Sequence, residues 1–498
     1  FGEAPGCGKT RCLAVAVYRT PEIDYFGPDA ADYMKSVIDL HRDNGISYAG
    51  FYSDEMHIQF DWDLEAHFGH DSEINARHVT PGLGAEYARR YGAQYADFAK
   101  YLVYFAYHQH DFLGGEEGAL PSQHVMGPDA AGLRRTLLFR KRYFEMLQRH
   151  VVDLCLATKD YAEACFGGPI MTRAHSTWQE APTCDRFFER QRFSKGEPEA
   201  FSRYDYTPDY VWSSSIRENI AACYDYFKWN EYLTGGGTDH PEGGFLDRCY
   251  YGSAFACSLA LLNRFPFSYY GFWGGPKPVM QRLADVGVTY GNQALGFETG
   301  HNLIQGLTPR VSEVLAVYPL DLNYTEERFG SWMVQYGYAD YITEEQLYKH
   351  FGGVSDGCVT VGERSYRTLL VLYSPLADSE LSEIGRKLCE SGGLCVWSSS
   401  PALGEDGLPS ADWRALFSVR AADFAPGGEK AGGDRIAFKG ALAGLAPMPV
   451  LTDLLPDFVY PVIPEEGAEV CAEVRGRSAG TLKRYPSGGR ALYLGFRP

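Results

Sequence analysis

The chain has 498 residues, a formal net charge of −18 and 45% hydrophobic residues, which is enough for two or three domains with a large core. The acidic balance excludes nucleic acid as a partner, because phosphate binding needs clustered lysine and arginine. No apolar stretch reaches the ~18 residues that span a bilayer, so we expect no membrane partner. The 12 scattered cysteines include no Cys-x-x-Cys pair, which favours free thiols in a reducing compartment over a zinc site.

Apolar runs of strand length alternate with helical patterns in the first part of the chain. The helix over 27–46 has Asp29 near its start and Gly45 at its end, which are typical boundary residues. Such alternation favours parallel βα units. In chain order the pattern predicts strand 11–18, helix 27–46, strand 47–55, helices at about 85–108 and 130–165, strands 169–182 and 209–215, helices 216–229 and 245–265, and strand 266–275.

Several of these strands end on clusters of polar and aromatic residues, namely SDEMH, HSTWQE, WSSS and YGFWGG. Clusters at successive strand ends are typical of the catalytic face of a (β/α)8 barrel, whereas a doubly wound sheet would gather them at one switch point. The sequence therefore predicts a TIM barrel over residues 1–306. About six of its eight strands are visible, so we expect the first two upstream of Phe1 and a barrel truncated at its N-terminus.

The pattern changes near residue 309, where a second α/β unit of the open-sheet type is predicted over 307–498. The region 401–445 is rich in Gly, Ala and Pro and is expected to form long loops. The predicted elements are strand 309–321, helix 343–352, strand 366–374, a capped helix 377–393, strand 394–401 and a closing hairpin 484–496.

Three motifs that would indicate other chemistry are incomplete. GEAPGCGKTR has Glu3 where a P-loop needs glycine, and a carboxylate there would repel phosphate. No Gly-x-Ser-x-Gly nucleophile elbow precedes a helix. Cys389 and Cys395 are predicted within a helix and a strand, not on the sharp turn that amidotransferase-like chemistry requires.

The C-terminal half resembles a known domain. The stretch YRTLLVLYSPLADSELSEIGRKLCESGGLCVW and the closing RYPSGGRALYLGF resemble the flavodoxin-like trimerisation domain of family 42 β-galactosidases. LRRTLLFRKRYFEMLQRHVVDL resembles the helix between barrel strands four and five of those enzymes. GFYSDE stands where their acid/base strand would be, and YYGFWGG where their eighth strand ends.

The resemblance is loose in its motifs. The usual Asn-Glu pair is Asp54-Glu55 here, the cysteine zinc cluster of some members is missing, and HSTWQEAPTCD and GGGTDHPEGGFLDR match nothing in that family. The related trimeric β-mannosidases of family 164 fit equally well. The resemblance thus implies a retaining glycosidase more firmly than it implies galactose. It also implies an oligosaccharide or polysaccharide substrate, a homotrimer, and no cofactor.

Retaining glycosidases need two carboxyl groups about 5–5.5 Å apart, one protonated and one ionised. Glu55 fits the acid/base role, because it ends a strongly apolar strand and the resemblance places the acid/base there; the alternative is that it faces solvent or pairs with an arginine. Asp54 is expected to bind sugar hydroxyls in place of the usual Asn, or to be structural. The nucleophile is Glu242, in the Gly-rich loop, or its rival Glu180, beside Trp178 at a strand end. Either glutamate could instead hold an arginine or a ligand hydroxyl.

Other side chains near these carboxylates suit sugar binding. Each candidate histidine stands close in sequence to a candidate carboxylate, and hydrogen bonding to sugar hydroxyls is favoured over a metal site, because no His-x-x-x-His spacing is present. The aromatic candidates offer flat faces for a pyranose ring, or pack in the core. The predicted binding residues are Asp54, His57, His175, Trp178, His240, Tyr270 and Trp273, and no metal is predicted.

A second class of function stays open, because a fold does not by itself specify an activity. It is a non-catalytic carbohydrate-binding or assembly protein built on a glycosidase-like barrel. Two glutamates facing one pocket would favour the enzyme, and a single one would favour the binding protein. For the trimer contact the candidate is the aromatic segment Arg328–Tyr341, since tryptophan and tyrosine are enriched at interfaces.

Overall fold

The computed structural model describes the chain in separate ranges, and several internal stretches are not described. The predicted strands 11–18, 209–215 and 266–275 and the predicted helices 216–229 and 245–265 lie outside it. The described residues are 19, 23–47, 50–53, 77–105, 129–168, 170–174, 312–317, 319–326, 339–422, 428–431, 433–452, 455–456 and 458–497.

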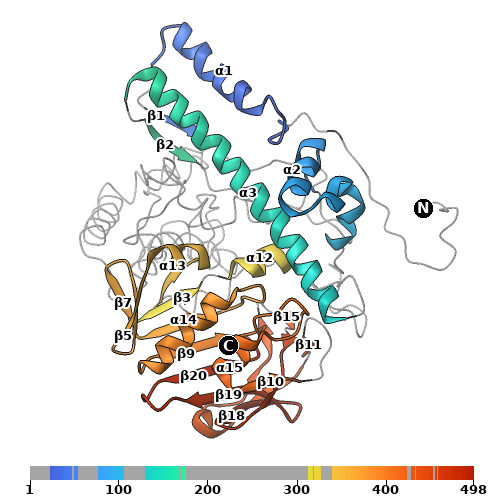
Figure 1. The fold of residues 1–498 in the computed structure, drawn as a ribbon, viewed down its shortest axis with the longest axis vertical. Coiled ribbons are helices and arrows are strands. Elements are labelled where there is room, and N and C mark those ends of the chain that lie inside the picture. Colours follow the sequence, from blue (N-terminus) through green and yellow to red (C-terminus); the bar gives the residue numbers. More distant parts are fainter. Residues whose placement is uncertain are drawn as a thin grey trace, which may run out of the picture.

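Two helices predicted in the first part of the chain are confirmed, and they pack against each other. Helix α1, Ala30–Asp43, follows Asp29 and is terminated by Gly45 at a φ of 75°. Helix α3, Ala130–Phe166, has 37 residues and is about 55 Å long at 1.5 Å per residue. The two lie side by side (Figure 1), where Ile38 of α1 packs on Ala162 of α3. Helix α3 runs from α1 to α12, beside the sheet of the second part of the chain (Figure 1).

The helix predicted at about 85–108 is wrong in its extent. Helix α2 spans Pro81–Tyr91 and begins earlier than expected, because the hydroxyl of Thr80 accepts a hydrogen bond from the amide of Leu83. It stops at Gly92, whose φ of 127° is not helical. Two 3-10 helices follow, η1 over Ala93–Ala96 and η2 over Phe98–Phe105. Aromatic rings of α2 and η2 then pack on α3, with Tyr87 and Phe98 within 5.5 Å of the Phe139 ring centroid.

Strands β1, Gly50–Ser53, and β2, Met171–Ala174, form a parallel pair. The register is continuous from Gly50 opposite Met171 to Ser53 opposite Ala174. Helix α3 lies in the connection between them, so β1, α3 and β2 make the βα unit that the sequence predicts for this region.

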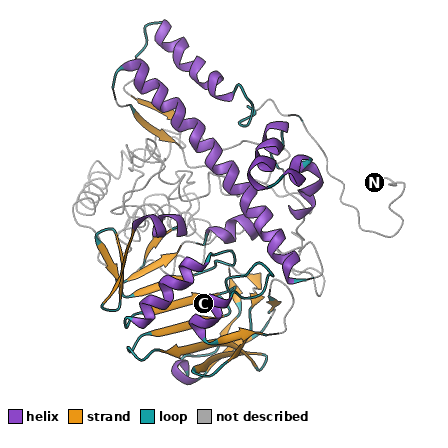
Figure 2. Cartoon of the chain, in the orientation of Figure 1, coloured by secondary structure: helices purple, strands orange, loops and turns teal. Residues whose placement is uncertain are grey.

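The second part of the chain contains a nine-stranded open sheet, and the predicted open-sheet type is confirmed (Figure 2). Five of its strands are mutually parallel, with the spatial order β4-β3-β8-β9-β20, which is 2-1-3-4-5 in chain order. They are β3 (Val314–Val317), β4 (Asp340–Ile342), β8 (Thr368–Val371), β9 (Leu394–Ser398) and β20 (Arg490–Leu494). Antiparallel strands extend the sheet beyond β20, in the order β19 (Arg477–Arg484), β18 (Ala468–Val474), β12 (Arg435–Phe438) and β13 (Met448–Pro449).

Helices and small sheets complete this unit. The helices are α12 (Leu320–Glu326), α13 (Glu344–His350), α14 (Ser379–Glu390), α15 (Ala411–Phe417) and the 3-10 helix η7 (Gly440–Leu442). An antiparallel sheet that the sequence pattern did not predict stands between α13 and β8, formed by β5 (Phe351–Ser355), β6 (Cys358–Val361) and β7 (Arg364–Tyr366). Three short pairs remain, which are β10 (Val419–Ala421) with β17 (Val462–Pro464), β11 (Glu429–Lys430) with β16 (Phe458–Val459), and β14 (Leu451–Thr452) with β15 (Leu455–Pro456).

Helix α15 corrects the expectation of long loops over 401–445. It has only seven residues, so its periodicity is weak, but the hydroxyl of Ser410 accepts a hydrogen bond from the amide of Trp413 at its start. The Trp413 side chain is fully buried and meets the ring of Tyr493, on β20, edge to face at a centroid distance of 4.8 Å. Burial of this large ring stabilises a helix that would be marginal alone.

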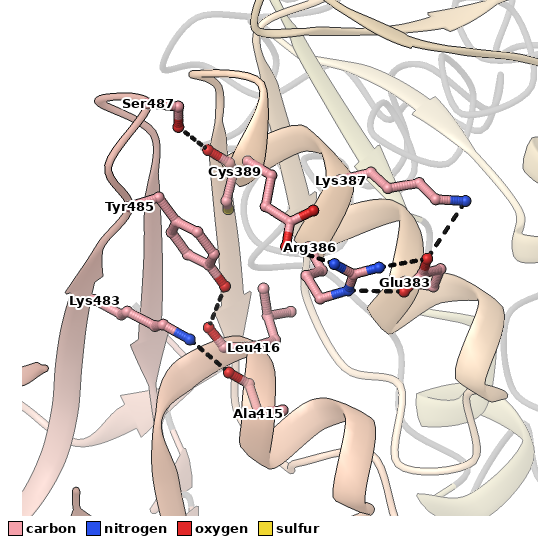
Figure 3. Close-up of polar contacts among 10 residues, drawn as sticks. Glu383, Arg386, Lys387, Cys389, Ala415, Leu416, Lys483, Tyr485 and Ser487 are labelled. Carbon is pink, nitrogen blue, oxygen red and sulfur yellow. Dashed lines mark hydrogen bonds and ion pairs between the residues drawn. The ribbon is translucent and has the colours of Figure 1, made fainter. Parts of the chain in front are cut away.

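The predicted closing hairpin is confirmed as β19 and β20 and is held against two helices (Figure 3). The Tyr485 hydroxyl donates to the carbonyl of Leu416 at 2.9 Å, and the Lys483 ammonium donates to that of Ala415 at 2.7 Å. The Ser487 hydroxyl donates to the carbonyl of Cys389 in α14. These bonds satisfy carbonyls at the ends of both helices.

Candidate functional site

The parallel pair of β1 and β2 is the part of the predicted catalytic face that the structure describes. Ser53 and Ala174 stand opposite each other and are the last residues of their strands. The chain therefore leaves both strands at the same edge of the pair. Asp54 and Glu55 follow directly after Ser53, and His175 follows Ala174. The register thus brings together the starting points of two of the predicted polar clusters.

The predicted site residues themselves lie outside the described residues, and their roles stay predictions. They are Asp54, Glu55, His57, His175, Trp178, Glu180, His240, Glu242, Tyr270 and Trp273. Most of the aromatic segment Arg328–Tyr341 is also outside, and its last residues begin strand β4.

A cluster of charged residues that the sequence pattern did not single out lies at the carboxyl ends of three neighbouring strands. Asp321 follows β3, Glu344 follows β4, and Asp378 lies beyond the end of β8. Asp321 is 3% exposed and pairs with the ammonium of Lys141, from α3, at 2.7 Å. Its other carboxylate oxygen accepts the amide of Leu376 at 3.0 Å. The Asp321 carboxylate is therefore bonded on both oxygens.

Glu344 carries the most perturbed carboxyl group of this cluster. Burial and the nearby carboxylates of Asp321 and Asp378 raise its pKa to about 7, although Lys141 and a hydrogen bond with Ser374 act in the opposite direction. The pKa of Lys141 is raised above its ordinary value, because the effect of Asp321 and Glu344 outweighs its burial. The cluster therefore holds one permanent positive charge and a carboxyl group that titrates near neutrality.

Asp378 and Tyr348 close the cluster on the side of α14. The Tyr348 hydroxyl donates to the Asp378 carboxylate at 2.9 Å, and the same oxygen accepts the amide of Glu380 as the N-cap of α14. Burial and the carboxylates of Glu344 and Asp378 raise the pKa of Tyr348, so its hydroxyl remains a donor.

Sequence signals for this cluster existed. Lys141 lies eight residues after Leu133 and four after Leu137, so the three share one face of α3. Both leucines are buried against Leu376 and Leu403. A lysine on a buried stripe indicates a buried partner, and Asp321 comes four residues after Val317, the last residue of the apolar strand β3.

The cysteines of the second unit are not suited to nucleophilic chemistry. Cys389 lies in α14 and Cys395 in β9, as expected, and both are buried (Figure 3 shows Cys389). Burial raises the pKa of Cys389 to about 12 and that of Cys395 well above its usual range. Both thiols thus stay protonated at neutral pH, and only a thiolate is a strong nucleophile.

Two features are absent from the described residues, a metal-binding cluster and a membrane-spanning helix. Within this part of the chain, no cluster of three or more His, Cys, Asp or Glu side chains could bind a metal ion. None of the helices in the described ranges is both long and apolar enough to cross a membrane.

Comparison with known proteins gives weak structural similarities. No family model and no curated protein matches the chain. A β-galactosidase from the psychrophilic Marinomonas ef1 has 11% identity and a TM-score of 0.47 over 95% of this chain and 72% of its own. A β-galactosidase from the haloarchaeon Halorubrum lacusprofundi has 13% identity and a TM-score of 0.46 over 95% and 71%. The exo-β-1,4-mannosidase Op5Man5 from Opitutaceae bacterium strain TAV5 has 10% identity and a TM-score of 0.34 over 95% and 90%. With TM-scores below 0.5, these similarities assign neither a family nor an activity to this chain.

Proposed function

We propose that the chain is a retaining β-glycosidase that hydrolyses β-galactosides or β-mannosides in oligosaccharides or polysaccharides by double displacement. Glu55 is the acid/base, and Glu242 or Glu180 is the nucleophile. Asp54, His57, His175, His240, Trp178, Tyr270 and Trp273 hold the sugar.

The observation that carries this proposal is the parallel register of β1 and β2. Ser53 and Ala174 end their strands side by side, and the chain continues from them into Asp54-Glu55 and into the segment that contains His175 and Glu180. In a (β/α)8 barrel, catalytic residues come from the carboxyl ends of several strands. The β1–α3–β2 unit supports a barrel over 1–306, in which this edge is the catalytic face.

The second unit, over 307–498, is assigned as a flavodoxin-like domain. The order 2-1-3-4-5 of its five parallel strands supports this assignment, because it is the order of the flavodoxin-like doubly wound sheet. The resemblance of this unit to a trimerisation domain fits an assembly role, and we propose a homotrimer in which it contributes to the subunit contacts.

The two carboxyl groups would act in sequence. In the first step, protonated Glu55 gives its proton to the glycosidic oxygen while the ionised nucleophile attacks the anomeric carbon, so that the aglycone leaves and a glycosyl ester forms. In the second step, ionised Glu55 takes a proton from water, which attacks the anomeric carbon and releases the nucleophile. Two inversions leave the configuration of the sugar unchanged.

A panel of 4-nitrophenyl glycosides tests the proposal. We expect hydrolysis of the β-D-galactoside or the β-D-mannoside, and a first-formed product with the β configuration in proton NMR. Rapid release of the α anomer would replace the mechanism by an inverting one. Sugar binding without hydrolysis of any glycoside would favour the carbohydrate-binding alternative.

A further inference from the structure

One face of the β1–β2 pair is covered by helices α1 and α3. Ile170, which directly precedes β2, is buried in one apolar cluster with Ile38 of α1 and Ala162 of α3. Successive residues of a strand belong to opposite faces of the sheet. Arg173, three positions after Ile170, therefore belongs to the face that is turned away from the two helices.

The parallel register carries this assignment over to β1. Tyr52 stands opposite Arg173, and residues in register on neighbouring strands share a face of the sheet. Tyr52 and Arg173 are thus both on the face away from α1 and α3. Continued by one position, the same alternation assigns Asp54 and His175 to this face. In a (β/α)8 barrel, the face away from the helices is the barrel interior.

An arginine at this register position needs an anionic partner. Arg173 is the one charged residue among the eight residues that pair in β1 and β2. Parallel strands are usually apolar because both of their faces are covered, and arginine is almost never buried there without a paired carboxylate. Asp54 is one strand across from Arg173 and two residues further along, which is a Cα separation of about 8 Å. A long arginine side chain can span that separation.

We propose that Arg173 is a positioning residue of the candidate site, and that its guanidinium group binds the Asp54 carboxylate on the face of the β1–β2 pair away from α1 and α3. A planar guanidinium can donate two parallel hydrogen bonds to a carboxylate. The pair keeps Asp54 ionised and fixes its direction, so that its remaining lone pairs accept hydrogen bonds from sugar hydroxyls. The binding of sugar by Asp54 rests on the proposed function, whereas the ion pair does not.

The pair also bears on Glu55, which follows Asp54 directly. Strict alternation would assign Glu55 to the helix-covered face, the face opposite to that of Asp54. To act as the acid/base beside Asp54, Glu55 requires the chain to depart from the strand alternation after Asp54. An Asp54 held by Arg173 fixes the last regular position before that departure.

A double-mutant cycle in urea unfolding tests the ion pair without any assumption about activity. Arg173→Met and Asp54→Asn should each lower the free energy of unfolding, because each change leaves the other group without its partner. The double variant should lose clearly less than the sum of the two single losses. Additive losses would overturn the proposal. If Arg173→Met does not fold, Arg173→Lys takes its place in the cycle, since an ammonium group cannot make the two parallel hydrogen bonds.

The positioning role is tested with whichever 4-nitrophenyl glycoside the chain hydrolyses. Arg173→Met should lower kcat/KM by about 10²-fold, because a displaced carboxylate misaligns the sugar, and Arg173→Lys should lose less. Adding Asp54→Asn to Arg173→Met should change kcat/KM by no more than about twofold. A full further loss would show that Asp54 acts independently of Arg173 and would overturn the proposal.

Thr172→Val is the matched control, because Thr172 is the neighbouring position of β2 on the helix-covered face. It should keep the wild-type kcat/KM, and a loss equal to that of Arg173→Met would show that any change in β2 disturbs the site. If the chain hydrolyses no glycoside, the proposed function fails, and the unfolding cycle still decides whether Arg173 and Asp54 form a pair.

Discussion

Glu55 is the residue on which the proposed chemistry depends most. It follows a short apolar strand, and a carboxyl group that must stay protonated at neutral pH needs a surrounding of low polarity. The pairing of β1 with β2 places Ser53, which leads into Asp54-Glu55, opposite Ala174, which leads into His175. General acid catalysis matters most for a poor leaving group, because a good one departs without a proton.

Glu55→Gln should therefore lower kcat/KM for a methyl or 4-nitrophenyl glycoside by about 10²–10⁴-fold, and much less for a 2,4-dinitrophenyl glycoside. Substitution of the nucleophile should remove activity on both substrates. Glu405→Gln, on an exposed loop, is the matched control and should behave as the wild type. Equal losses on all leaving groups in Glu55→Gln would argue against its acid/base role.

Lys141 contributes to the stability of the fold, whereas Glu55 is proposed to act in catalysis. Lys141→Met leaves Asp321 buried without its cation, and we expect the free energy of unfolding to fall by about 3–5 kcal/mol. In the double variant Lys141→Met/Asp321→Asn the neutral side chain can still accept the amide of Leu376, so part of this loss should be recovered. Urea unfolding measures the free energy of unfolding of the single and the double variant. A double variant less stable than Lys141→Met would contradict a charge-based explanation.

Elements with clear end signals were predictable from the sequence. The boundaries of α1, α3 and α14 agree with Asp29, Asp129 and Asp378 at their starts, and β3, β8 and β9 are short apolar runs between turn residues. The sheet of β5, β6 and β7 was not predicted, because strands of three to five residues are too short for a reliable alternation pattern. The stripe of Leu133 and Leu137 signals that Lys141 has a buried partner, but local patterns could not identify Asp321 as that partner, because the two residues are 180 positions apart in the chain.

The packing of α3 against the second sheet can be tested at one glycine. A Cβ atom at Gly407 would lie 1.8 Å from the carbonyl oxygen of Ala130, at the start of α3, and its φ is 76°. Gly433 has nearly the same φ and open space around it. Both changes to alanine cost about 1 kcal/mol for the left-handed backbone, and Gly407→Ala should cost clearly more in chemical unfolding. Equal costs would show that this contact does not hold α3 in place.

In the molecule as a whole, the structure describes an open α/β sheet in the second part of the chain. In the first part it describes helices and one pair of parallel strands. The mixed α/β class and the open sheet are confirmed. The barrel, the boundary near 306, the site residues and the trimer stay predictions. The geometry of the candidate site residues does not follow from the sequence, because Gly-rich and aromatic segments specify residue types and no fixed backbone.

Assembly is the first prediction at this scale. The proposed flavodoxin-like domain is expected to mediate self-association, and its resemblance to a trimerisation domain implies a closed cyclic trimer. Light scattering coupled to size exclusion should give three times the mass of 55.5 kDa, independent of concentration. Trp332→Ala, in the segment Arg328–Tyr341, should weaken the trimer. A stable monomer would leave that segment as a contact within one chain.

The central claim is a covalent glycosyl-enzyme intermediate, and its capture is the most direct test. A 2-deoxy-2-fluoro glycoside with a 2,4-dinitrophenyl leaving group forms the ester quickly and hydrolyses it slowly, so peptide mass spectrometry can find the labelled residue. The proposal predicts one fluorosugar per chain, on the peptide that contains Glu242 or on the one that contains Glu180. Substrate turnover with no labelled peptide, or a label on neither glutamate, would contradict it.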